Sequence, residues 1–165
     1  MDKKKVSESA LVDQVHPVFP LNMNANDTVF GGFVMALLDQ VALVVAERHS
    51  ERTCVTASVD AMHFLAPAHR GDNLIICAAI NRTWNSSMEI GLKVEAQNPK
   101  SRKNIHIVSA YYTFVAIDSN GKPIPVSELA LSTQAEKRRF EEAQLRRTNR
   151  VKQAAELKKI RDSYN

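Results

Sequence analysis

Asp39 is the residue whose position in the sequence points most clearly to chemistry. It lies in the middle of an apolar run from Phe30 to His49, beside Leu38 and Val41. Removing a carboxylate from water costs several kcal/mol unless it is paired or protonated. Burial and partners also tune such an acid for use as a general base. We therefore predict a catalytic role for Asp39; the alternative is a structural carboxylate paired with an arginine or a hydroxyl group.

Two adjacent glycines, Gly31 and Gly32, stand at the start of the same run. The N–H groups of a first helical turn have no partners within the helix, and the helix dipole is positive there. Glycine leaves room for a ligand oxygen to approach these donors, so the pair is a candidate oxyanion hole. The alternative is that the two glycines only allow the helix to pack closely on a sheet.

The spacing between these groups limits what one chain can do. Gly31 and Asp39 are eight residues apart, which is about 12 Å along a helix. Both groups cannot contact one carbonyl group at hydrogen-bond distances of about 3 Å. If two such helices pack antiparallel about a two-fold axis, the glycine end of one comes level with the aspartate of the other. We therefore predict two equal sites per dimer, each built from both chains.

The segment that carries these residues is predicted to be a helix from Phe30 to His49. It contains no proline, and its only glycines lie in the first turn. Thr28, at the end of a turn-rich loop, is the predicted N-cap. The helix is apolar nearly all round until Glu47, so another element must cover it.

Five segments, separated by proline, glycine and asparagine, are predicted to be strands: residues 10–19, 54–64, 73–84, 87–97 and 105–118. In the fourth of these, apolar residues alternate with Glu89, Lys93 and Glu95, which indicates one solvated face. A strongly curved antiparallel sheet wrapped round one central helix is the economical way to bury that helix. The predicted fold class is α+β.

Length and composition indicate one ordinary soluble domain, with 165 residues, 44% of them hydrophobic and 24% charged. The basic start of the chain is not followed by an apolar stretch, so it does not resemble a signal peptide. The longest apolar runs fall short of the roughly 20 residues that span a bilayer. We predict a cytoplasmic protein without stable membrane insertion.

The net charge of +4 is unevenly distributed. Residues 132–165 contain ten Lys or Arg and five acids, which gives +5 and leaves −1 for residues 1–131. We predict a domain over 1–131 and a basic helical extension over 132–165. Because the domain is nearly neutral, the basic total does not indicate nucleic-acid binding. The extension has a poor apolar stripe and is predicted to be a partly solvated helix; contact with acidic lipid or another subunit is the alternative.

The cysteines and histidines indicate no metal site. Cys54 and Cys77 lie in strand-like apolar runs without a C-x-x-C pattern, so both are predicted to be reduced, buried packing residues. The five histidines show no metal-ligand spacing with one another or with the cysteines. We therefore predict that the protein binds no metal.

Five blocks of the sequence, in order, resemble the hotdog-fold acyl-CoA hydrolases, which include the brain-type cytosolic acyl-CoA thioesterases and their short bacterial relatives. The blocks are N-A-N-D-T-V-F-G-G-F-V-M-A-L-L-D, V-T-A-S-V-D-A-M-H-F-L-A-P, R-G-D, S-S-M-E-I-G-L-K-V and T-F-V-A-I-D-S-N-G-K-P-I-P-V. The tail segment E-K-R-R-F-E-E-A-Q also resembles the brain-type enzymes. Each block alone is weak, but five in the same order are specific.

The resemblance implies a single hotdog domain that hydrolyses fatty acyl-CoA to a fatty acid and free CoA. Asn24 matches the catalytic asparagine of the family and Asp39 its catalytic aspartate, contributed by different subunits. The minimal active unit would then be a homodimer, and a trimer of dimers is plausible. No cofactor is implied, because coenzyme A belongs to the substrate. Asn22, Asp27 and Gln40 stand where Asp, Gly and Glu are usual, and Asp27 puts the shape of the loop in question.

Two groups of residues are candidates for contact with CoA. The resemblance places three serines beside the pantetheine arm: Ser58, Ser86 and Ser87. Three cations of the segment N-P-K-S-R-K-N could bind the nucleotide phosphates as charge-assisted donors: Lys100, Arg102 and Lys103. The alternatives are ordinary strand and turn residues for the serines, and a solvated hairpin tip for the cations.

Two other functions are weighed on the same fold. A hydroxyacyl thioester dehydratase needs a histidine opposite the helix carboxylate, and the loop N-A-N-D-T-V-F-G-G contains none. A non-catalytic acyl-CoA sensor tends to lose the acid and gain a DNA-binding segment. Here Asp39 is present, and the segment before Leu21 is too short for a helix-turn-helix.

Overall fold

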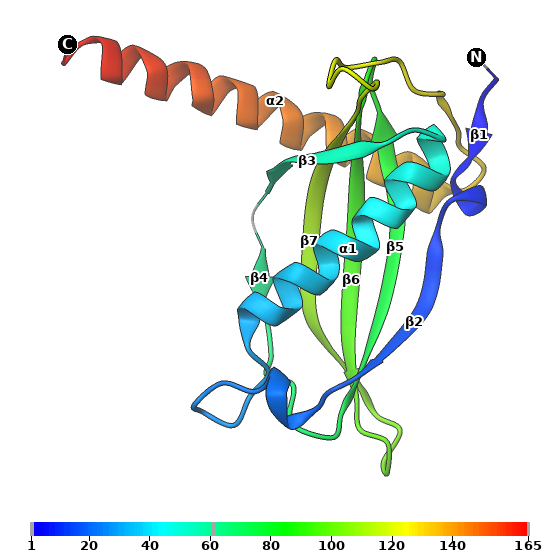
Figure 1. The fold of residues 1–165 in the computed structure, drawn as a ribbon, viewed down its shortest axis with the longest axis vertical. Helices are drawn as coiled ribbons and strands as arrows, with labels where there is room; N and C mark the ends of the chain where they lie inside the picture. Colours follow the sequence, from blue (N-terminus) through cyan, green and yellow to red (C-terminus); the bar gives the residue numbers. More distant parts are fainter. Residues whose placement is uncertain (1, 61, 165) are drawn as a thin grey trace.

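The computed structural model describes residues 2–60 and 62–164, in which one sheet curves around a helix and a second helix lies behind the sheet (Figure 1). The elements in chain order are β1 (Lys4–Lys5), η1 (Val6–Glu8), β2 (Leu11–Pro17), η2 (Pro20–Asn22), α1 (Gly31–Ser50), β3 (Cys54–Val59), β4 (His63–Phe64), β5 (Asn73–Thr83), β6 (Ser87–Gln97), β7 (Asn104–Ala116), β8 (Leu129–Ala130) and α2 (Gln134–Asp162).

The main sheet has the strand order β2-β5-β6-β7-β3, and β4 also pairs with β7. All of these pairings are antiparallel. Alternation along β6 explains how the sheet is oriented: Met88, Ile90 and Leu92 are buried in the core, whereas Lys93 is exposed on the other face. Glu89 shares that other face but is fully buried beside Arg146 of α2, so the predicted solvated face is wrong at this residue. The predicted α+β arrangement of a curved antiparallel sheet round a long helix, expected for a hotdog domain, is confirmed.

The helix α1 is covered by the sheet on one face only. Its buried residues are Val34, Leu38, Ala42, Val45, Ala46 and His49. On its other face Met35 is 45% exposed and Val44 is 40% exposed. The sheet therefore covers one side of this apolar helix, as predicted. The other side is exposed in a single chain.

Three local predictions differ from the structure. The predicted strand 54–64 is interrupted, because β3 ends at Val59 and β4 begins at His63. The helix begins at Gly31, and its N-cap is Phe30, which provides no capping side chain. Thr28 instead binds the Asn24 side chain within the preceding loop.

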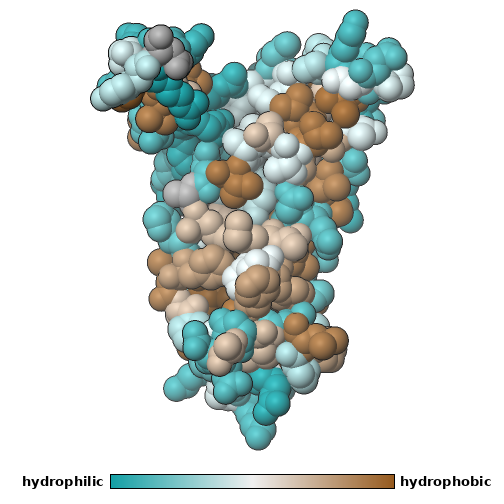
Figure 2. Space-filling model, turned by 60° about the vertical axis from the view of Figure 1, so that its left-hand side comes forward, coloured by the Kyte–Doolittle hydropathy of each residue, from teal (hydrophilic) through white to brown (hydrophobic). Residues whose placement is uncertain are grey.

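The strand β3 forms one edge of the sheet. It is last in the strand order and pairs with β7. Val55 and Val59 on this strand are each 43% exposed. An edge strand has backbone N–H and C=O groups that another chain can pair with. Hydrophobic side chains also gather on the molecular face where β3, β4 and the start of α1 lie (Figure 2).

The helix α2 lies on the outer face of the sheet, away from α1 (Figure 1). It begins with a capping box, in which the Thr133 side chain accepts from the Glu136 N–H and the Glu136 carboxylate accepts from the Thr133 N–H. Ala143 is its buried residue. The predicted helix over the tail is confirmed, and its first half packs on the sheet rather than lying in solvent.

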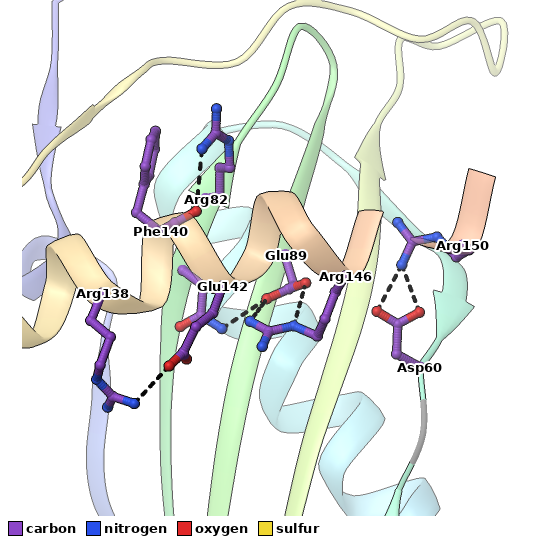
Figure 3. Close-up of polar contacts among 9 residues, drawn as sticks. Asp60, Arg82, Glu89, Arg138, Phe140, Glu142, Arg146 and Arg150 are labelled. Carbon is purple, nitrogen blue, oxygen red and sulfur yellow. Dashed lines mark hydrogen bonds and ion pairs between the residues drawn. The ribbon is translucent and has the colours of Figure 1, made fainter. Parts of the chain in front are cut away.

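Arginines rather than an apolar stripe hold α2 to the sheet (Figure 3). Arg146 forms a two-bond ion pair with the fully buried Glu89, at 2.7 and 3.1 Å. Its guanidinium also stacks 3.7 Å from the centre of the Tyr111 ring. The Arg82 guanidinium, from β5, lies 3.9 Å from the centre of the Phe140 ring. Cation–π contacts and bidentate pairs of this kind replace apolar burial at the interface.

The two cysteines are both reduced, but only one is buried. Cys54 is buried, as predicted, whereas Cys77 is half-buried and its Sγ lies 3.6 Å from Asp13 Oδ1. Cys77, in the middle of β5, therefore lies on the outer face of the sheet rather than in the core, and the prediction of burial is wrong for it. Within residues 2–60 and 62–164, no helix is long and apolar enough to cross a membrane.

Candidate active site

The Asp39 carboxylate is held by a neighbouring strand. Thr56 Oγ1 donates a hydrogen bond to Asp39 Oδ1 at 2.7 Å. Thr56 is placed opposite this turn of α1 because β3 pairs with β7, in which its partner is Phe114. Asp39 is half-buried rather than buried, so the desolvation cost inferred from the sequence is smaller in one chain. No Lys, Arg or His of the described chain forms an ion pair with it.

Tyr112 fixes the same turn of α1 from the sheet side. Its hydroxyl group donates to the Met35 carbonyl at 3.1 Å. Met35 is one helical turn before Asp39. Burial, and to a lesser degree the charge of Asp39, raises the pKa of Tyr112 to about 12. The hydroxyl therefore remains a donor at neutral pH and keeps the carboxylate-bearing turn against the sheet.

Asn24 organises the loop before α1. Its Oδ1 accepts from the Asn26 and Thr28 N–H groups at 2.8 and 3.2 Å, and its Nδ2 donates to Thr28 Oγ1 at 2.9 Å. An amide nitrogen has two hydrogens, so one donor remains for another acceptor. The loop tolerates Asp27, whose φ of 55° is a left-handed conformation that aspartate adopts more readily than most residues.

The two glycines lie in the first turn of α1, close to two aromatic rings. A Cβ added to Gly31 would stand 3.3 Å from Phe64 Cζ, and one added to Gly32 would stand 2.6 Å from the Phe30 ring. Close packing therefore contributes to the choice of glycine. The N–H groups of this turn receive no capping side chain from Phe30. An oxyanion hole at Gly31 and Gly32 stays a prediction, and both explanations of the glycines are compatible with this geometry.

Asn24 and Gly31 line one cavity of about 420 Å³. Its walls also include Val34, Phe64 and Leu65, which make it largely apolar. Asp39 is not part of this lining. The chain thus brings the asparagine and the glycine end together and leaves the aspartate further along the helix. A larger cavity of about 480 Å³ lies on the outer face of the sheet, beside α2, and includes none of the predicted site residues.

The candidate CoA contacts lie at opposite ends of the sheet. Ser86 and Ser87 stand at the turn where β5 leads into β6, and the Ser86 and Ser87 carbonyl groups accept from Ala116 and Trp84. Ser58 is half-buried in β3. The cations Lys100, Arg102 and Lys103 lie exposed in the β6–β7 hairpin. That hairpin is at the end of the sheet where α1 begins (Figure 1).

Two residues that shape the site, Thr56 and Tyr112, were missed by the sequence analysis. Both lie in strands rich in apolar and β-branched residues, and the pattern of such a strand does not mark an individual hydroxyl group as functional. Their relevance depends on which residues the sheet places opposite one turn of α1. The pattern along a strand does not contain that information.

Comparison with known proteins defines the class to which this fold belongs. The thioesterase superfamily profile matches residues 26–103. Cytosolic acyl coenzyme A thioester hydrolases of rat and mouse are 40% identical over 138 residues, which is 82% of this chain and 35% of theirs. The chain therefore spans about a third of the length of these relatives.

Solved structures agree with the sequence relatives. An apo-hexameric acyl-CoA thioesterase is 34% identical, with a TM-score of 0.90 over 94% of this chain and 99% of that one. An acyl-CoA hydrolase from Staphylococcus aureus, in complex with butyryl coenzyme A, coenzyme A and coenzyme A disulfide, is 33% identical, with a TM-score of 0.88 over 96% of each chain. The fold is that of a hotdog thioesterase domain. This chain belongs to the thioesterase superfamily.

Variants of the Staphylococcus aureus hydrolase bear on the site. Its structures include alanine replacements of an asparagine, an aspartate and a threonine, which follow one another in that order along its chain. Asn24, Asp39 and Thr56 stand in the same order here. The sequence spacing from the asparagine to the aspartate, and from the aspartate to the threonine, is also identical in the two proteins.

Proposed function

We propose that this protein is an acyl-CoA thioesterase, which hydrolyses fatty acyl-CoA to a free fatty acid and CoA. The observation that carries the proposal is the half-buried Asp39 carboxylate on α1, which accepts a hydrogen bond from Thr56 Oγ1. Family membership and the matching spacing of Asn24, Asp39 and Thr56 support it. The loop before α1 contains no histidine, which disfavours a dehydratase.

In the proposed mechanism the thioester carbonyl oxygen lies over the Gly31 and Gly32 N–H groups. These donors stabilise the negative charge that develops on that oxygen, and loss of one such donor typically costs about 2.7 to 4 kcal/mol in the barrier. The free N–H of the Asn24 amide orients the attacking water or the carbonyl group.

Asp39 supplies the chemistry by one of two routes. As a general base it takes a proton from water, whose oxygen attacks the carbonyl carbon; the C–S bond breaks and the proton passes to the CoA sulfur. As a nucleophile it attacks the carbonyl carbon itself, releases CoA, and forms a mixed anhydride that water then hydrolyses. Single-turnover hydrolysis in heavy-oxygen water can detect the anhydride route, because label enters Asp39 only when water attacks the Asp39 carbonyl carbon of that intermediate.

Each complete site is proposed to combine Asn24 and the glycine end of one subunit with Asp39 of another. The cavity at Asn24 and Gly31 does not include Asp39, and β3 offers an open edge beside the exposed face of α1. A homodimer would then be the minimal active unit. The hexameric relative makes a trimer of dimers the natural larger assembly.

The remaining assignments follow from the same proposal. The exposed cations Lys100, Arg102 and Lys103 would bind the CoA phosphates, because their hairpin lies at the cavity end of the sheet. Ser86 and Ser87, at the other end, could contact CoA only in a site completed by the partner. We also propose a cytoplasmic protein without a cofactor or nucleic-acid partner, and a thioesterase domain over 1–131 with a helical extension over 132–165.

A thiol-release assay across acyl chain lengths tests the activity. Asp39→Asn keeps the shape of the side chain and can still accept from Thr56 Oγ1, but it removes the base. We expect turnover to fall by about a hundredfold or more, the usual scale for loss of a general base. Gln40→Glu, at the exposed neighbouring position, is the matched control and should retain activity. Full activity of a folded Asp39→Asn variant would contradict the proposal.

A further inference from the structure

The helix α2 extends well past the sheet that it packs on. Its first half contacts the sheet, whereas all residues from 151 to its end at Asp162 are exposed. At a helical rise of about 1.5 Å per residue, this exposed segment spans about 18 Å. Figure 1 shows this end of α2 projecting beyond the rest of the molecule.

The helix leaves the sheet at the open edge. Arg150, the last α2 residue that is not exposed, donates two hydrogen bonds to the Asp60 carboxylate at 2.6 and 2.7 Å (Figure 3). Asp60 directly follows β3, the edge strand. The projecting half of α2 therefore passes over the space into which a second sheet would continue if another chain paired with β3.

The inward face of α2 continues along the projecting half. Residues of α2 that face the sheet and its adjoining loops include Phe140, Ala143, Arg147 and Arg150, which recur at intervals of three and four. The same spacing leads to Ala154, Leu157 and Arg161, within the helix that ends at Asp162. These residues fall on one face, because intervals of three and four alternate along one side of a helix.

This continued face repeats the chemistry of the bound half. It again combines small and apolar residues, Ala154 and Leu157, with an arginine, Arg161. Most of the stability of a helix comes from tertiary packing, which the projecting half lacks within the described chain. The projecting half is thus suited to lie on a surface like the one that binds the first half.

We propose that residues 151–162 of α2 pack on the outer face of a second copy of this chain, across the β3 edge. Neighbouring strands are about 4.8 Å apart, so a segment of about 18 Å would cover about four strands of the partner. A two-fold axis makes the contact reciprocal, with the two α2 helices running antiparallel. The proposal rests on the pairing of subunits at β3 that the proposed function includes, but not on catalysis.

Two variants of the full-length protein test the contact. Leu157→Glu places a charge on the continued face, where Leu157 is 45% exposed. Ala155→Glu adds the same charge to the same helix at an exposed residue that is turned away from that face. Sedimentation over a dilution series should show that Leu157→Glu dissociates at a concentration at least tenfold higher than wild type. Ala155→Glu should stay within about twofold of wild type.

Amide hydrogen exchange gives a second measurement that does not require the assembly to dissociate. In the assembled wild type, the peptide 151–162 should exchange slowly, and in Leu157→Glu it should exchange rapidly while α1 is unchanged. Rapid exchange of this peptide in assembled wild type would overturn the proposal. Equal dissociation of the two variants would also overturn the proposal. This remains true if Leu157→Glu loses binding to anionic vesicles, a result that would assign the continued face to a lipid surface instead. Loss of thioesterase activity alone would bear only on the proposed function.

Discussion

At the scale of single residues, Thr56 is the partner of the proposed base. Its hydroxyl orients Asp39 at 2.7 Å, and a hydrogen bond to a charged group contributes about 1.5 to 3 kcal/mol. Thr56→Val keeps the shape of the side chain and should lower kcat by about tenfold or more, with little change in KM. Thr56→Ser restores the hydroxyl and should recover most of the rate. Equal rates for the Val and Ser variants in a thiol-release assay would refute the role.

The environment of His49 leads to a prediction of how the free energy of unfolding depends on pH. It is buried in the last turn of α1, and its Nε2 donates to the Ser127 carbonyl at 2.9 Å. Its Nδ1 is buried without a partner in the described part of the chain. Burial, together with the charge of Lys4, lowers the pKa of His49 even though the bond to Ser127 opposes this.

The lowered pKa means that the folded protein favours neutral His49. The contribution of neutral His49 to the free energy of unfolding is complete above the pKa of about 6.5 that histidine has in the unfolded chain. It is lost as the pH falls below that value, by up to about 1.4 kcal/mol per pH unit. His49→Gln keeps a donor for Ser127 but does not titrate, so it should remove this part of the slope. Urea unfolding of both proteins from pH 8 to pH 5 makes the comparison; identical slopes would rule the assignment out.

Asp39 and Asn24 could be proposed as site residues from the sequence because an acid in an apolar run and a specific loop motif are local features. Thr56 could not be identified, since its role depends on the register of β3 with β7. The same limit applies to Tyr112, whose hydroxyl meets a carbonyl group 77 residues away. Contacts between elements that are distant in the sequence are the part of the site that local sequence patterns do not predict.

At the scale of elements, most helices and strands follow from local patterns. The segments predicted over 73–84, 87–97 and 105–118 match β5, β6 and β7 closely at both ends, because alternation and turn residues mark where each strand stops. The break between β3 and β4 was missed. Asp60 stands there, and its partner Arg150 is 90 residues away.

The contact between α2 and the sheet was also missed, because arginines form it. Glu89 is fully buried and binds both Arg146 and Asn81. Arg146→Met removes the charge partner but keeps much of the length of the side chain. A buried carboxylate left unpaired typically costs about 3 to 5 kcal/mol, so we expect the free energy of unfolding to fall by about that amount.

A double variant provides the control for this prediction. Adding Glu89→Gln removes the unpaired charge, and the new amide oxygen can still accept from Asn81, so much of the stability should return. Urea unfolding followed by the fluorescence of Trp84, the single tryptophan, measures both variants. Trp84 is a suitable probe because its Nε1 donates to Gln144 in α2. A cost below about 1 kcal/mol for Arg146→Met would show that the pair contributes little.

At the scale of the whole molecule, the proposed division of the site between two chains predicts complementation. Asn24→Asp keeps the oxygen that organises the loop but removes the amide donor, and Asp39→Asn removes the base. In a mixed dimer of the two variants, one site contains both changes and the other contains neither. Random mixing yields half mixed dimers, so activity should return to about a quarter of wild type.

The measurement is a thiol-release assay before and after the two variants exchange subunits. Each variant alone is the control, and both should be nearly inactive. If every site lay within one chain, each site of a mixed dimer would still carry one defect. Activity that never exceeds the average of the separate variants would exclude a shared site.

The arginine contacts of α2 also affect how the chain can be made. The ribosome synthesises α2 after the sheet, so the outer face of the sheet stays uncovered until α2 has been made. That face presents Asn81, Glu89 and Lys93, which water can solvate, and α2 is itself highly charged. Contact between them therefore does not depend on a large apolar patch that would stay exposed before they meet. A nascent chain with this design can form its sheet first and dock α2 afterwards with little tendency to aggregate.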